Sequence, residues 1–339
     1  MKITYKPFEL ELKHPFRISK HTRTSTPLIL LEISSQGFTG YGEASMVPYM
    51  GESVQTATDF LKKVNLDWVN YPFDFAAINN YLDTLASGNP AIKAAVDIAL
   101  HDLKGKIEDK PCYSFFNSNP AQMPLTSQTI GIDTFEIIKL KVAEAVKCKV
   151  LKVKLGSAND KELISAIREV TDKPLYVDAN QGWTDRTHAL EILWFLKENG
   201  VQLVEQPMDK NKIDDNAWIT QNSPLPIIAD EAVQRHSDIE KIKGAYHGIN
   251  IKLMKSAGMF EAYKMIERAR QLKMKILIGC MSETSIATLA AAALAPLCDW
   301  CDLDGPFLTK NNPFKDPDFN EGRYILTDKP GLGLEFNPQ

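Results

Sequence analysis

The feature that most constrains this chain is a regular alternation of short apolar runs with amphipathic segments after residue 123. The runs read PLTSQTIG, VLKVKL, PLYVDA, VQLVEQ, PIIADE, GINIKL, KILIGC and WCDLDG. Short strands that alternate with helices of about 10–15 residues are typical of βαβ units and a parallel sheet. Eight such runs in succession favour a sheet closed into a barrel. We therefore predict an α/β protein with a closed, TIM-like barrel over residues 121–314.

Residues 1–120 follow a different pattern. Two segments with alternating polarity within residues 1–35 predict antiparallel strands, joined by the polar loop RISKHTRTST, and the Gly-rich stretch GFTGYGEAS is turn-like. Three amphipathic segments near 52–64, 74–86 and 90–107 predict helices. We predict a separate α+β domain over residues 1–120, joined by the C-terminal tail, residues 315–339.

Composition and charge argue against several classes of protein. The chain of 339 residues has a formal net charge of −4, so no basic field indicates nucleic-acid binding. No apolar run approaches the roughly 20 residues of a membrane helix, and the start MKITYKPFELELKHPF lacks the apolar core of a signal peptide. Five scattered cysteines fit free thiols. We expect a cytoplasmic protein that binds neither nucleic acid nor membrane, and the sequence leaves open a homo-oligomer.

Charged side chains stand at the ends of most of the predicted strands. They are Lys152 and Lys154, Asp178, Glu205, Asp230, Lys252, and Asp302 with Asp304. The carboxyl ends of barrel strands meet at one mouth, where barrel enzymes carry out their chemistry. Asp178, Glu205 and Asp230 offer hard oxygen ligands at a number that suits Mg²⁺. A lone acid at a strand end is more often a helix cap, but the ordered series indicates a metal site between lysines.

Lys152 and Lys154 pose an electrostatic problem. They lie two residues apart on a predicted strand and therefore point to the same face. Two ammonium groups side by side in a buried place repel each other and lose hydration. The carboxylates between Lys154 and Lys252 supply compensating negative charge. The repulsion also favours a neutral amine on one of the two neighbouring lysines, as a general base requires.

The ordered motifs resemble those of the enolase superfamily, in its muconate-lactonizing subgroup. The resemblance rests on KVK (152–154), VDAN (177–180), VEQP (204–207), ADE (229–231) and KLMKSAG (252–258). It implies a capping domain, a (β/α)7β barrel, and Mg²⁺ bound by Asp178, Glu205 and Asp230. It also implies removal of the proton α to a substrate carboxylate, which gives an enediolate. With Lys154 and Lys252 as two catalytic bases, the implied reaction is a 1,1-proton transfer, meaning racemisation or epimerisation.

Several activities of this subgroup share the two lysines: dipeptide epimerase, N-acylamino acid racemase, o-succinylbenzoate synthase and muconate cycloisomerase. Asp302 and Asp304 favour the first, because paired carboxylates need a cation and a dipeptide supplies its N-terminal ammonium. Dipeptide epimerases carry a similar Asp-x-Asp at this place. The non-enzymatic alternative is a barrel that only binds peptides, and the presence of both lysines argues against it.

Further residues are candidates for contact with a dipeptide substrate. Thr129 ends the first predicted strand, Cys280 and Ser282 follow the seventh, and Lys152 lies beside the base Lys154. Alignment of the segment after HPF places His21 where Ala-Glu epimerases carry an arginine that resembles the counter-ion of the glutamate side chain, with Arg17 and Arg23 near but out of step. Without a matched cation a buried carboxylate is unfavourable. We therefore expect an Ala-Xaa epimerase that inverts the C-terminal residue and favours a small or hydrophobic second residue, as in Ala-Ala, over Glu.

Overall fold

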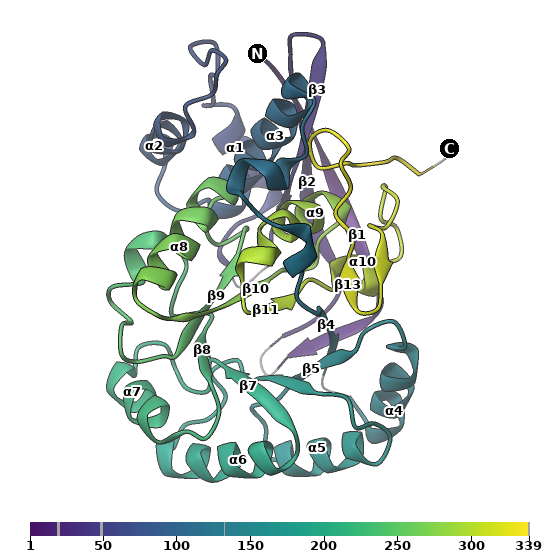
Figure 1. Ribbon diagram of the computed structural model, residues 1–339, viewed down its shortest axis with the longest axis vertical. Helices are drawn as coiled ribbons and strands as arrows, with labels where there is room; N and C mark the ends of the chain where they lie inside the picture. Colours follow the sequence, from purple (N-terminus) through teal and green to yellow (C-terminus); the bar gives the residue numbers. More distant parts are fainter. Residues whose placement is uncertain (19–20, 48–49, 132, 338–339) are drawn as a thin grey trace.

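The computed structural model describes residues 1–18, 21–47, 50–131 and 133–337, with the backbone alone for residues 16–18 and 21. An N-terminal antiparallel sheet with its helices occupies the upper part of Figure 1, and a parallel sheet surrounded by helices occupies the lower part. The two parts pack directly on each other, because the third strand of the N-terminal sheet contacts a barrel helix.

Eight parallel strands form the barrel in sequence order. They are β4 (Ser127–Ile130), β5 (Val150–Lys154), β6 (Leu175–Asp178), β7 (Val201–Glu205), β8 (Ile227–Ala229), β9 (Gly248–Lys252), β10 (Lys275–Gly279) and β11 (Trp300–Asp302). A parallel bridge between Thr126 and Cys301 joins the last strand to the first. Each apolar run of the sequence lies on one of these strands, so the predicted barrel is confirmed.

Helices cover the outside of the barrel strands (Figure 1). They are α4 (Phe135–Glu144), α5 (Asp160–Arg168), α6 (Arg186–Glu198), α7 (Ile213–Asn222), α8 (Met259–Gln271), α9 (Ser285–Leu294) and α10 (Gly305–Leu308), with the 3₁₀ turns η4 (His236–Asp238) after β8 and η5 (Ala295–Leu297) before β11. In α6, Asp185 accepts a hydrogen bond from the His188 amide and begins the helix, whose buried face includes Ile192 and Leu196. Within the described residues, no helix is long and apolar enough to cross a membrane.

The N-terminal sheet departs from the prediction at two places. Its strands are β1 (Lys2–Ile18), β2 (His21–Ser35) and β3 (Phe38–Ser45), and its helices are α1 (Val54–Leu61), α2 (Phe75–Leu85) and α3 (Pro90–Glu108). The polar stretch predicted as a loop continues the β1–β2 hairpin, in which Phe16 pairs with Arg23 and Ile18 with His21. The Gly-rich stretch predicted as a turn is the strand β3.

The glycines of β3 are explained by the close approach of α3. A Cβ atom on Gly42 would lie 1.9 Å from the carbonyl oxygen of Ala95, and one on Gly40 would lie 2.0 Å from that of Ala99. Both glycines therefore serve packing between a strand and a helix, and neither makes a turn. Local sequence reasoning cannot distinguish these two uses of glycine, because the partner helix lies about 50 residues further along the chain.

The C-terminal tail contacts the N-terminal part of the chain. After the short hairpin β12 (Phe319–Asn320) and β13 (Arg323–Tyr324), Gly331 pairs with Pro111, directly before the 3₁₀ turn η2 (Cys112–Phe116). A second 3₁₀ turn, η3 (Pro120–Gln122), precedes the barrel. The Leu332 amide donates a 2.8 Å hydrogen bond to Asp102 of α3. These contacts agree with a tail joined to the N-terminal domain, and the domain boundaries themselves stay a prediction.

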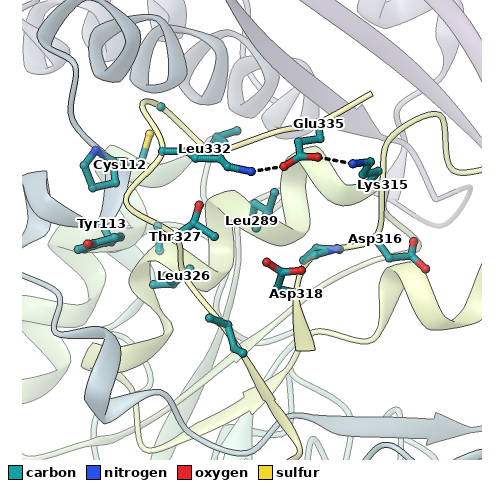
Figure 2. A pocket seen from close by; sticks show the side chains of 17 residues that line it. Cys112, Tyr113, Leu289, Lys315, Asp316, Asp318, Leu326, Thr327, Leu332 and Glu335 are labelled. Atoms are coloured by element: carbon teal, nitrogen blue, oxygen red, sulfur yellow. Dashed lines mark hydrogen bonds and ion pairs between the residues drawn. The ribbon is translucent and has the colours of Figure 1, made fainter. Parts of the chain in front are cut away.

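A hollow of about 260 Å³ lies between the tail and α9 (Figure 2). Lys315 and Lys329 both form ion pairs with Glu335 at its rim. Cys112, Tyr113 and Leu289 contribute to its wall. None of the side chains predicted to bind metal or substrate lines this hollow.

Replacement of Gly42 by Ala tests the packing of β3 on α3. Overpacking of this kind costs about 1–3 kcal/mol, so we expect the melting temperature to fall by several degrees. The measurement is thermal unfolding followed by circular dichroism. Ser35→Ala, at the end of β2 in the same sheet, is the control and should change the melting temperature little. Equal melting temperatures for Gly42→Ala and the parent chain would show that α3 can move away without cost.

Candidate active site

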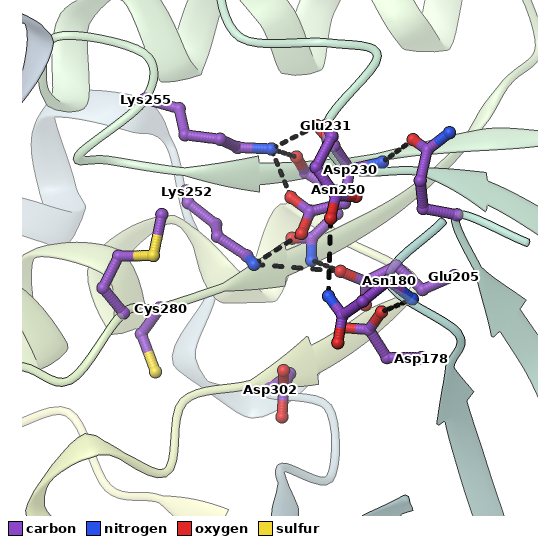
Figure 3. Close-up of polar contacts among 12 residues, drawn as sticks. Asp178, Asn180, Glu205, Asp230, Glu231, Asn250, Lys252, Lys255, Cys280 and Asp302 are labelled. Carbon is purple, nitrogen blue, oxygen red and sulfur yellow. Dashed lines mark hydrogen bonds and ion pairs between the residues drawn. The ribbon is translucent and has the colours of Figure 1, made fainter. Parts of the chain in front are cut away.

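Three buried carboxylates meet at the carboxyl ends of neighbouring barrel strands (Figure 3). Asp178 ends β6, Glu205 ends β7, and Asp230 follows β8. Asp178 and Glu205 are direct partners in the parallel register, which places their side chains next to each other. One oxygen from each of the three carboxylates lies within 4.8 Å of the other two. Such a set could hold a divalent metal ion.

Two lysines flank this carboxylate cluster from opposite sides. The Lys154 Nζ on β5 donates a 2.6 Å hydrogen bond to Asp178 Oδ2. The Lys252 Nζ on β9 donates a 2.7 Å hydrogen bond to Asp230 Oδ2. Because β5 and β9 lie on either side of β6–β8, the two amines face each other across the carboxylates. The sequence predicted this arrangement, and their catalytic roles belong to the proposal below.

Lys152 has a different environment from Lys154. Its Nζ donates 2.7 Å hydrogen bonds to both Glu205 Oε2 and Asp302 Oδ2, and the side chain is fully buried. Burial opposes the charge, but Asp302 and Glu205 outweigh it and raise the pKa of Lys152 well above its ordinary value. Of the two neighbouring lysines, Lys152 is therefore held as an ammonium ion that links the carboxylate cluster to the last strand.

The carboxylates of the cluster differ in their proton affinity. Burial, and then the charge of Asp178, raises the pKa of Glu205 to about 8. Burial acts in the same direction on Asp178 and Asp230, but the nearby lysines outweigh it and lower both pKa values. The cluster thus combines strong negative charge with one carboxyl that holds a proton easily. A bound divalent cation would favour ionisation of all three groups.

The surroundings of the cluster fit a hydrated cation with oxygen ligands. Asn180 Oδ1, Glu231 Oε2 and Asn250 Oδ1 are buried atoms without a hydrogen-bond partner among the described residues. Figure 3 shows Asn180, Glu231 and Asn250 gathered around the carboxylates. Unused oxygen acceptors of this kind suit water molecules bound to a metal ion, because such water donates both of its protons.

Two residues of the site were missed by the sequence analysis. The Asn250 Nδ2 donates a 2.8 Å hydrogen bond to Glu205 Oε1. The Lys255 Nζ forms an ion pair with Asp230 and donates a further 2.7 Å bond to its backbone carbonyl. Asn250 could have been found, because it stands two residues before Lys252 on the same strand face. Lys255 follows the strand, where no periodicity indicates its direction.

Asp302 and Asp304 occupy the mouth but have different partners. Asp302 accepts hydrogen bonds from Ser127 Oγ at 2.6 Å and from Lys152 Nζ. Asp304 accepts a 2.6 Å bond from the Thr129 amide, and burial followed by the charge of Asp302 raises the pKa of Asp304 to about 6. Asp302 is therefore already paired with the Lys152 ammonium, and binding of a substrate ammonium by Asp302 and Asp304 stays a prediction.

The loop after β10 brings Cys280 and Ser282 to the same mouth. The Cys280 thiol donates to Asp304 Oδ1 at 3.6 Å. The Ser282 Oγ accepts a 2.8 Å hydrogen bond from Arg23 Nη2, so the β1–β2 hairpin reaches the barrel mouth. Thr129 and Cys280 thus both contact Asp304, and Ser282 lies on the same loop as Cys280. Contact of these three residues with a substrate stays a prediction. The side chain of His21 lies outside the described residues.

Comparison with known proteins identifies the family of the chain. Residues 2–116 match the N-terminal domain of the mandelate racemase/muconate lactonizing enzymes, and residues 132–339 match the enolase C-terminal domain-like family. An L-Ala-D/L-Glu epimerase of Bacteroides thetaiotaomicron is 50% identical over 98% of this chain and 88% of the relative. An L-Ala-D/L-amino acid epimerase of Pedosphaera parvula is 37% identical over 98% and 99% of the two chains.

A solved structure with this fold carries both a metal and a dipeptide. It is a dipeptide epimerase of Enterococcus faecalis V583 complexed with Mg and L-Leu-L-Tyr, 30% identical, with a TM-score of 0.90 and coverage of 98% of both chains. The similarity extends over both the N-terminal sheet and the barrel. This chain therefore belongs to the mandelate racemase/muconate lactonizing enzyme family, as the ordered lysine and carboxylate motifs of its sequence indicated.

Proposed function

We propose that this protein is a Mg²⁺-dependent dipeptide epimerase that inverts the α-carbon of the C-terminal residue of Ala-Xaa dipeptides. The observation that carries the proposal is the placement of Lys154 and Lys252 on opposite sides of a buried cluster of three carboxylates. A substrate carbon between two amines can lose a proton on one face and gain one on the other. The relatives named as dipeptide epimerases support the substrate class.

Asp178, Glu205 and Asp230 are the residues that would hold Mg²⁺. Bound there, the ion would supply positive charge beside the substrate carboxylate and stabilise the negative charge that develops as the α-proton leaves. Asn250 keeps Glu205 in position, and Lys255 does the same for Asp230. These contacts fix the directions of the ligand oxygens before the metal binds, which is the usual role of groups around a metal site.

The proton transfer itself is assigned to the two lysines. A neutral amine on one of them removes the α-proton, and the ammonium ion of the other donates a proton to the opposite face. After one turnover the lysines have exchanged their protonation states, so the reverse stereoisomer is the matching substrate for the next. Lys152 takes no part in the transfer, because its ion pairs with Glu205 and Asp302 keep it charged.

The ammonium of the dipeptide is assigned to the acidic end of β11. Asp304 is buried, and the charge of Asp302 adds to the effect of burial on its pKa. A cation at this place would balance the two acids. N-acylamino acids, succinylbenzoate precursors and muconate lack such a cation, and this disfavours the other activities of the subgroup.

A second candidate concerns the preferred second residue. The Arg23 guanidinium lies at the mouth, within 2.8 Å of Ser282 Oγ, where it could pair with a glutamate side chain. The 50% identical relative is named an L-Ala-D/L-Glu epimerase, which supports Ala-Glu as a substrate. The preference for small or hydrophobic residues, which rested on His21, stays a prediction that the experiment on Arg23 below can decide.

Asp230→Asn tests the metal site. Loss of a partner outside the ligand set already lowers metal affinity by about 10–100-fold, so loss of a ligand should cost at least as much. The measurement is isothermal titration with Mg²⁺, together with the rise in melting temperature that a bound ion produces. Asp304→Asn, at the same mouth but outside the triad, should bind Mg²⁺ nearly as the parent chain does. Unchanged Mg²⁺ affinity of Asp230→Asn would reject the assignment.

Lys154→Met and Lys252→Met test the two bases. Each change should abolish net epimerisation, because one face of the α-carbon loses its proton donor or acceptor. In D₂O, each variant should still exchange the α-proton of one stereoisomer, read by mass spectrometry. Lys197→Met, on the exposed side of α6, is the control and should epimerise normally. Complete epimerisation by either active-site variant would exclude the two-base mechanism.

Arg23→Gln tests how the second residue is chosen. If Arg23 pairs with glutamate, its loss should lower kcat/KM for Ala-Glu by about 10–100-fold and leave Ala-Ala nearly unchanged. N-acetyl-Ala-Ala serves as the control substrate, because it lacks the ammonium and should be poor for both proteins. An equal loss for Ala-Glu and Ala-Ala would show that Arg23 does not recognise the side chain. A parent enzyme that prefers Ala-Ala would support the prediction from His21.

A further inference from the structure

The loop of residues 280–284 joins two parts of the molecule. It leads from β10 to α9 at the barrel mouth and carries Cys280 and Ser282. Described side chains of the N-terminal sheet that contact it include Arg23 on β2, and Glu43 and Ser45 on β3. Glu43 is fully buried and lies outside the carboxylate cluster, and a buried carboxyl is costly unless its contacts compensate for the lost water.

Glu43 binds the residue that begins α9. Its carboxyl oxygens accept hydrogen bonds from the Thr284 amide at 2.9 and 3.2 Å and a further bond from the Thr284 hydroxyl. Thr284 is the N-cap of α9, and its own hydroxyl oxygen accepts a 3.2 Å bond from the Ile286 amide. Burial raises the pKa of Glu43 to about 7, while the bonds from Thr284 act in the opposite direction.

Ser45 and Arg23 hold the same loop at Ser282. Ser45 lies two residues after Glu43 and therefore on the same face of β3. Its hydroxyl donates a 2.6 Å hydrogen bond to the carbonyl of Ser282, and Arg23 donates to the Ser282 hydroxyl. The loop is thus fixed to the N-terminal sheet at both Ser282 and Thr284, on either side of the buried Glu283.

The other end of the loop contacts the candidate site for the substrate ammonium. Cys280 donates its thiol to Asp304 at 3.6 Å. Within the loop, the Glu283 carboxyl accepts a 2.9 Å hydrogen bond from the Met281 amide and closes a tight local turn. A shift of Thr284 would therefore reach the mouth through only four residues, of which Met281 and Glu283 are joined by this hydrogen bond.

We propose that Glu43 is a positioning residue, which acts through Thr284 to fix the loop 280–284 and with it Cys280 and Ser282 against the substrate and Asp304. The proposal deepens the proposed function and rests on it for the identity of the substrate. Fixation of the loop can be measured without any turnover, because Cys280 is a half-buried thiol and the other four cysteines are buried.

The experiment measures alkylation of Cys280 by iodoacetamide at fixed pH, read by mass spectrometry of peptides. The rate of alkylation of Cys280 should be at least about tenfold higher in Glu43→Ala than in the parent chain. This is the factor expected when the hydrogen bonds of a buried carboxyl are lost. Glu43→Gln should restore slow labelling, because its amide oxygen can still accept the Thr284 N–H. Ser45→Ala removes the contact at Ser282 and should accelerate labelling to a smaller extent. It replaces Glu43→Ala as the test if that variant does not fold.

Asp97→Asn is the matched control. Asp97 is also a buried acid of the N-terminal domain, and it accepts hydrogen bonds from the Met259 and Phe260 amides at the start of α8. Its replacement disturbs the contact between the domains at a different helix and should leave Cys280 labelling unchanged. Equally fast labelling in Asp97→Asn and Glu43→Ala would overturn the proposal in favour of general loosening. Unchanged labelling in folded Glu43→Ala and Ser45→Ala would also overturn it.

Kinetics separate this proposal from the proposed function. Glu43→Ala should raise KM for Ala-Xaa dipeptides by about tenfold with a smaller effect on kcat, and Mg²⁺ affinity should stay the same. A loss of Mg²⁺ affinity as large as the rise in KM would place the effect at the metal cluster. It would contradict a role confined to the loop. If the labelling results hold but the parent chain epimerises no dipeptide, positioning of the loop stands and the proposed function fails.

Discussion

The balance of buried charge at the barrel mouth is the constraint on which the rest of the site depends. Among the described residues, ion pairs there join four buried lysines to four buried acids: Lys152, Lys154, Lys252 and Lys255, and Asp178, Glu205, Asp230 and Asp302. Removal of one partner from a buried ion pair costs about 3–5 kcal/mol, because the other charge stays without compensation. Replacement of any one of these residues by a neutral one therefore leaves an uncompensated charge on its partner. The same ion pairs fix the orientation of each amine and each carboxylate.

The barrel makes this balance geometrically simple. In a parallel sheet with regular register, residues at equivalent strand ends become neighbours, as Lys154 and Asp178 do across β5 and β6. Side chains of the N-terminal domain then bind the first residues of two helices that follow these strands. Asp97 accepts from the start of α8 and Glu43 from Thr284 at the start of α9, where the exposed amides and the helix dipole favour an acid. The mouth is thus built by both parts of the chain.

Much of this could be predicted from the sequence, for identifiable reasons. The strands were found because buried parallel strands are short apolar runs, and Asp178, Glu205 and Asp230 because they end such runs. The periodicity of β3 was hidden, since Gly40 and Gly42 have no side chain to show which face is buried. The reach of Arg23 to Ser282 was also inaccessible, because it depends on how a hairpin lies over a barrel formed more than a hundred residues later.

Lys152 shows why the identity of a site residue can be predicted more easily than its role. The sequence correctly placed two lysines on one face, but their partners decide what each can do. Lys154 donates to Asp178, whereas Lys152 bridges Glu205 and Asp302. Under the proposed function, that bridge connects the acids that would hold Mg²⁺ to the acids that would bind the substrate ammonium. Inside the barrel, one buried ammonium ion therefore holds the metal-binding carboxylates and the acidic end of β11 at a fixed distance from each other.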